Sequence, residues 1–240
     1  MKRLSLLTLI FAILSLTFFL LLIFLRIPFP SYPLMSVQDV FDILTSLVLI
    51  PIYWLMFRSI SQNRLGLGSE IFFMVMAAFW VAGQGMHLSA NSINNLIGNL
   101  AKNRLVDITT TDIYHLTYFY DEYLGHYLWH IGIVGLAALL IYESWCEPAQ
   151  EKTDWRLVIP AGIIYGFTCF CFFVEGNTLI LGLPFTFIVT LLVFIWGRKK
   201  LAQQPILAFF FVACSFALLL FAGWWLYWGR MIPIMEAIPL

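Results

Sequence analysis

Seven long apolar segments restrict what this chain can fold into. Each holds roughly 20 consecutive, mostly apolar residues, the length that a helix needs to cross the hydrocarbon core of a bilayer. Only helices and closed barrels satisfy their backbone hydrogen bonds in lipid. The sequence therefore predicts an all-α, polytopic integral membrane bundle of about seven transmembrane helices, at residues 4–25, 37–57, 71–91, 122–142, 157–174, 178–196 and 206–228.

The composition agrees with a membrane protein. Hydrophobic residues make up 62% of the chain and charged residues 11%, against roughly 25% charged residues in an average soluble domain. The formal net charge is zero, so we expect a lipid bilayer and no nucleic acid as partner. Residues 1–240 form one transmembrane domain, and the mixed stretch within 92–121 predicts an interfacial helix. Nothing in the sequence indicates an oligomeric state.

The positions of Lys and Arg predict the orientation. With the N-terminus in the cytoplasm, nine of the 13 basic residues fall on the inner side and four on the outer side, as the positive-inside rule requires. The C-terminus then lies outside. The first apolar run follows Met1, Lys2 and Arg3 but is too long for a signal peptide and lacks an A-x-A-like site, so we expect a retained helix. We predict a multi-pass protein of the cytoplasmic membrane of a prokaryote.

Several ionisable residues lie inside or at the ends of the apolar segments. Such residues are costly in a bilayer and usually serve a function. In the predicted topology they share one depth near the outer interface, although they come from different spans. The set comprises His87, Asp121, Glu122, His126, His130 and Glu175.

The spacing of Glu122, His126 and His130 places them on one helix face, at i, i+4 and i+8. Imidazoles one turn apart can ligate one metal ion, and His87 would add a ligand from another helix. Zinc bound by three side chains lowers the pKa of its water towards 7 and supplies hydroxide. We predict His87, His126 and His130 as metal ligands, with zinc favoured over iron or copper. Glu122, rather than Asp121, is expected to face them as general base or as the group that orients an imidazole.

Two further polar residues are candidates for the wall of the pocket. Gln84, His87 and Asn91 share a face at helical spacing, and Glu175 stands in a tight reversal between two spans. We predict Asn91 and Glu175 as groups that bind the ligand. The alternative is that both residues cap helix ends or face water.

The leading hypothesis is a membrane-embedded, metal-dependent hydrolase or lipid-modifying enzyme, acting on a lipid or other apolar substrate near the outer leaflet. One alternative is a proton- or cation-coupled transporter or channel-like protein. Another is a subunit that binds a partner or a haem, since His87 with His126 or His130 could provide two axial ligands. A retinal protein is not expected, because the last span contains no lysine.

Overall fold

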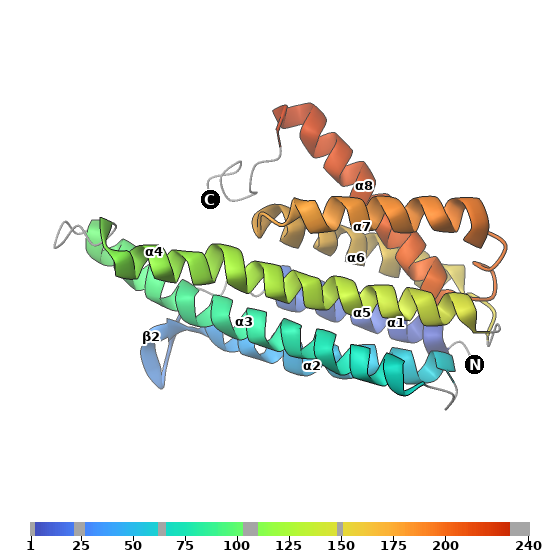
Figure 1. The fold of residues 1–240 in the computed structure, drawn as a ribbon, viewed down its shortest axis with the longest axis horizontal. Helices are drawn as coiled ribbons and strands as arrows, with labels where there is room; N and C mark the ends of the chain where they lie inside the picture. The colour runs from blue at the N-terminus through green and yellow to red at the C-terminus, as the bar shows by residue number, and fades with distance from the viewer. Residues whose placement is uncertain (1–2, 22–26, 62–65, 103–109, 148–150, 231–240) are drawn as a thin grey trace.

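The computed structural model describes residues 3–21, 27–61, 66–102, 110–147 and 151–230. Within these residues, seven helices are long and apolar enough to cross a membrane, which confirms the predicted all-helical membrane bundle (Figure 1). Three of the seven contain a π-helical turn. The helices are α1 (Arg3–Leu16) with η1 (Thr17–Leu21), α2 (Val37–Ser61), α3 (Leu67–Lys102), α4 (Asp112–Tyr118) with η4 (Phe119–Gly125) and α5 (His126–Cys146), α6 (Trp155–Glu175), α7 (Leu179–Leu192) with η5 (Val193–Gly197), and α8 (Pro205–Trp228).

A small antiparallel hairpin precedes the second span. It pairs β1 (Pro28–Phe29) with β2 (Tyr32–Ser36). The next helix starts with reciprocal caps: the Asp39 backbone N–H donates to Ser36 Oγ at 3.1 Å, and the Ser36 N–H donates to Asp39 Oδ2 at 2.7 Å. Asp39 is therefore a helix cap.

The first span packs inside the bundle. Phe11 and Ala12 of α1 are fully buried, and the Phe11 ring meets Tyr53 edge-on with centroids 4.6 Å apart. Phe11 also contacts Tyr165 of α6 and Phe209 of α8. The helix is thus part of the core.

Two of the helices are much longer than predicted. α3 has 36 residues, and the continuous helix Asp112–Cys146 has 35. At 1.5 Å per residue each is about 50 Å long, against about 30 Å of hydrocarbon. The two run side by side and extend beyond the other helices at one end of the bundle (Figure 1).

This extension replaces the interfacial helix predicted within 92–121. α3 continues without a break to Lys102, and the next helix begins at Asp112. The polar residues after Asn91 do not end the helix, and no helix-breaking proline occurs between Leu67 and Lys102. Residues 103–109 lie outside the described residues.

Glycines bring α3 and the α4–η4–α5 helix together. A Cβ atom on Gly83 would lie 2.2 Å from the Trp129 backbone nitrogen, and one on Gly132 would lie 2.6 Å from the Met76 carbonyl oxygen. A Cβ on Gly125 would lie 3.0 Å from the His87 nitrogen. The backbones therefore approach more closely than larger residues allow. This contact positions His87 beside the other helix.

Candidate functional site

The candidate site lies where α3 meets η4 and the start of α5. His87 is 20 residues from Leu67, the first residue of α3, and His126 is 20 residues from Cys146, the last residue of α5. Each distance is about 30 Å along a helix, close to the thickness of the hydrocarbon core. Both histidines therefore lie about one membrane thickness from the same end of the bundle, a distance compatible with the predicted common depth.

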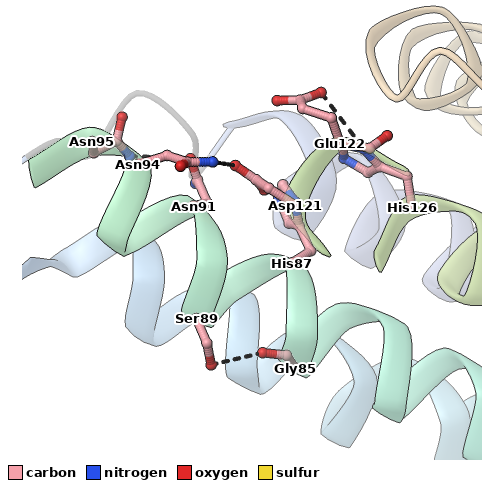
Figure 2. Close-up of polar contacts among 9 residues, drawn as sticks. All are labelled: Gly85, His87, Ser89, Asn91, Asn94, Asn95, Asp121, Glu122 and His126. Carbon is pink, nitrogen blue, oxygen red and sulfur yellow. Dashed lines mark hydrogen bonds and ion pairs between the residues drawn. The ribbon is translucent and has the colours of Figure 1, made fainter. Parts of the chain in front are cut away.

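A buried pair forms the outer part of the site. His87 Nδ1 lies 2.7 Å from Asp121 Oδ1, and the two side chains are 16% and 3% exposed. The other carboxylate oxygen, Oδ2, accepts a hydrogen bond of 2.8 Å from Asn94 Nδ2 (Figure 2). Asn94 is two turns further along α3 than His87. Both carboxylate oxygens thus have a partner on that helix.

The expectation that Glu122 rather than Asp121 faces the histidines is wrong for His87. Both carboxylates belong to η4, a π-helical segment with i→i+5 hydrogen bonds. The 100° rotation per residue of an α-helix therefore does not hold there. Glu122 does approach His126, as the i, i+4 spacing predicts. Its Oε2 is 3.9 Å and its carbonyl oxygen 3.2 Å from His126 Nδ1, while its side chain is 39% exposed.

The three predicted histidines form a row of neighbouring rings. The ring centroids of His87 and His126 are 4.4 Å apart, and those of His126 and His130 are 5.8 Å apart. Trp129 packs against all three rings, with centroid distances of 5.7, 6.1 and 5.2 Å. The structure therefore brings together the histidines of two helices that the sequence assigned to one site.

Each imidazole has an oxygen atom next to its Nδ1. The partners are the Asp121 carboxylate for His87, the Glu122 carbonyl for His126, and the Thr178 hydroxyl for His130, at 2.5 Å. This arrangement leaves the Nε2 atom of each imidazole available for another partner. In the described part of the chain, however, no three His, Cys, Asp or Glu side chains are placed to hold one metal ion.

Asn91 does not point to this cluster. Its Oδ1 accepts a hydrogen bond of 3.1 Å from Asn95 Nδ2 on the same helix (Figure 2). Gln84 also turns elsewhere: it accepts from Trp80 Nε1 at 2.9 Å and donates to the Asp42 carbonyl at 2.7 Å. Gln84, His87 and Asn91, which were predicted to line one wall of a cavity, therefore each contact a different partner.

Glu175 ends α6 and is exposed, although the turn that follows it lies against the histidines. A Cβ on Gly176 would lie 2.6 Å from His130 Cε1. Asn177 has φ of 50°, a left-handed conformation that asparagine tolerates better than most residues. The carboxylate of Glu175 acts electrostatically on Glu122. The turn, more than the Glu175 side chain, closes this side of the site.

Three contact residues were not predicted from the sequence: Asn94, Trp129 and Thr178. Asn94 follows His87 by seven residues, so its place on the same face of α3 was detectable. Thr178 meets His130 across 48 positions of sequence, and Trp129 is one aromatic residue among many. No local sequence pattern indicates either contact.

Aromatic residues bound the cluster on its inner side. Phe172 and Phe173 of α6 pack against His130, with ring centroids 4.9 and 5.4 Å away. Beyond them is an apolar pocket between α5, α6, α7 and α8, which these two rings help to line together with Ala137, Phe185, Phe210 and Cys214. The polar residues thus lead into the bundle and end at an apolar wall.

Two mammalian proteins resemble this chain. It is 28% identical over 199 residues to ceroid-lipofuscinosis neuronal protein 6 homolog of Canis lupus familiaris, covering 72% of this chain and 60% of that protein. It is 32% identical over 154 residues to ceroid-lipofuscinosis neuronal protein 6 of Homo sapiens, covering 61% and 46%. The matches span about half the length of these curated relatives.

No family model and no solved structure matches the chain. Both relatives come from mammals, so they give no support to the predicted prokaryotic membrane. Their names state no activity, metal or substrate. Taken with the seven apolar helices, the likeness identifies a multi-pass integral membrane protein similar to ceroid-lipofuscinosis neuronal protein 6.

Proposed function

We propose that the chain is a membrane-embedded enzyme that acts on a lipid or another apolar substrate at one boundary of the bilayer. The buried pair of His87 and Asp121, with His126 in ring contact, carries this proposal. A carboxylate on Nδ1 fixes the tautomer and orientation of an imidazole and raises its basicity. Where no metal ion is bound to it, His87 Nε2 is then suited to take a proton from a substrate or a water molecule.

We further propose that a divalent transition metal, zinc before iron or copper, is held by His87, His126 and His130. An oxygen partner on each Nδ1 is the environment typical of metal-ligating histidines, which bind through the other nitrogen. When bound, the metal would activate a water molecule for hydrolysis. Since no described group of three is placed around one point, the rings would have to turn towards each other to share an ion.

The row of histidines also favours a second candidate function, proton- or cation-coupled transport. A row of titratable side chains leading inward is typical of a proton relay. In this chain the row stops at Phe172 and Phe173, with the apolar pocket beyond them. A site with one polar entrance and an apolar floor suits an amphiphilic substrate better than an ion that must cross, so the enzyme is our first choice.

Elemental analysis and lipid mass spectrometry test both parts of the proposal. Detergent-purified protein should contain about one transition metal per chain, and His126→Ala should lose it. The matched control is His115→Ala, because His115 is exposed on α4. Reconstituted protein should convert a component of a mixed lipid extract, and Asp121→Asn should abolish the conversion.

Three other results would overturn parts of the proposal. If metal-free protein still converted a lipid in the presence of a chelator, the proposed metal would be wrong and the proposed enzyme would stand. Metal-free protein that converts no lipid but carries protons across liposomes would establish the transporter. A haem absorption band would indicate electron transfer. A fluorescent fusion in the source cell would show in which membrane the protein resides.

A further inference from the structure

Three segments of the chain meet at the end of the bundle opposite the histidines: the start of α1, the residues before α6, and the turn after η5 (Figure 1). The Thr153 N–H donates to the Ala202 carbonyl at 3.0 Å, and the Thr153 hydroxyl donates to the Leu201 carbonyl at 2.5 Å. The Asp154 N–H donates to Ser5 Oγ at 3.2 Å. These hydrogen bonds hold the three segments side by side.

Exposed basic side chains flank this junction. Each belongs to a residue within three positions of one of these hydrogen bonds, and together we call them the basic surface: Arg3, Lys152, Arg156, Arg198 and Lys199. Among the described residues, no ion pair involves any of them, whereas Arg58 of α2, at the same end of the bundle, pairs with Glu70 at 3.6 Å. The positive-inside rule explains why basic residues lie on one side of a membrane, but it does not require them to gather at one junction.

The carboxylates around the junction do not cancel this charge. Glu151 Oε1 accepts a hydrogen bond of 3.1 Å from a backbone N–H of α1, and Asp154 Oδ1 accepts one of 3.2 Å from a backbone N–H of α6. Glu147, directly after α5, is the third. All three residues are half-buried, while the five residues of the basic surface are exposed. The junction therefore presents a net positive charge to its surroundings.

Tryptophans beside two of the arginines indicate the depth of the basic surface. Trp155 precedes Arg156 and is 38% exposed, and Trp196 stands two residues before Arg198 and is 64% exposed. Exposed tryptophans of membrane proteins concentrate at the level of the lipid headgroups. A guanidinium group at that depth can bind a phosphate through two parallel hydrogen bonds. Further along α6, the exposed Ile159 offers apolar surface to a hydrocarbon chain.

We propose that the basic surface binds an anionic phospholipid of the adjoining leaflet, with its phosphate at Arg156 and Arg198 and its acyl chains along α6 and η5. A phospholipid matches both the positive charge and the apolar surface next to it, whereas a soluble anion matches only the charge. The inference is independent of the proposed enzyme, because the basic surface and the histidines lie at opposite ends of the bundle.

Native mass spectrometry of the protein in detergent tests this proposal. The protein is mixed with equal amounts of phosphatidylglycerol and phosphatidylcholine of the same chain length. One exposed basic residue contributes about fivefold to the affinity for an anionic lipid, so two arginines should give phosphatidylglycerol a preference of about 25-fold. Arg156→Gln should reduce that preference about fivefold, and Arg156→Gln combined with Arg198→Gln should abolish it. Arg58→Gln is the matched control and should leave it unchanged, because Arg58 has its own carboxylate partner.

Equal retention of the two lipids by the unaltered protein would overturn the proposal. A preference that survives the double substitution would do the same, with thermal melts confirming that the variant is folded. If the double variant does not fold, Lys199→Glu replaces a single exposed side chain and should by itself reduce the preference at least fivefold. Displacement of phosphatidylglycerol by inorganic phosphate at constant ionic strength would show a site for a free anion and contradict the lipid.

Discussion

At the scale of single residues, the pair of Asp121 and His87 has the largest energetic consequence. Asp121 is 3% exposed and uses both oxygens on α3, whereas Glu122 is 39% exposed and meets His126 mainly through its backbone. Removing one partner of a buried pair leaves the other without compensation, which is far more costly than losing an exposed contact. The two adjacent carboxylates therefore have different roles.

Asp121→Ala should lower the free energy of unfolding by about 3 kcal/mol, the typical loss when one partner of a buried pair is removed. Glu122→Gln should cost less than about 1 kcal/mol. Thermal denaturation in detergent, followed by tryptophan fluorescence, measures both. Equal losses in the two variants would show that the carboxylates do not differ in burial.

At the scale of elements, the π-helical segment η4 and the glycines of the α3 interface determine which residues meet. The sequence predicted the meeting of His87 with His126, because ionisable residues of two spans shared one depth. It did not predict that Asp121, rather than Glu122, pairs with His87, because the rotation per residue in η4 differs from that of an α-helix. The contact of Thr178 with His130 depends on how α7 packs, and no local pattern encodes that.

Gly83→Ala should destabilise the bundle by about 1 to 3 kcal/mol, the usual cost of overpacking, because its Cβ would lie 2.2 Å from the Trp129 nitrogen. Gly85→Ala is the matched control, two residues along the same helix. Nothing lies within 4 Å of its Cβ, so alanine should be neutral or stabilise by up to about 1 kcal/mol. Melting temperatures of the two variants provide the test, and similar values would contradict the close approach of the two backbones.

At the scale of the whole molecule, three spans lie between the site at the end of α3 and the loop after α7. They are α4–η4–α5, α6 and α7, so the site and that loop are expected on opposite sides of the membrane. The distribution of Lys and Arg predicts that the site faces outwards. This orientation determines which side of the membrane supplies the substrate.

Cysteine labelling can determine the orientation. In a Cys146→Ser background, which removes the exposed native thiol, Asp112→Cys should react with an impermeant maleimide on intact cells. Lys199→Cys should react only after permeabilisation. Both replaced residues are exposed in the structure. Labelling of both from one side would contradict the seven-span arrangement.

The long helices that carry the site also link it to the thickness of the surrounding lipid. About 30 Å of α3 separates Leu67 from His87, which matches the thickness of the hydrocarbon core, so we expect the buried pair where hydrocarbon gives way to headgroups. A thicker bilayer would draw Asp121 into hydrocarbon unless the helices tilt, and a thinner one would leave it in water. Protein reconstituted in lipids of increasing chain length should therefore show a maximum of lipid conversion at one thickness, which mass spectrometry can locate. Membrane thickness would then regulate this protein with no dedicated regulatory site.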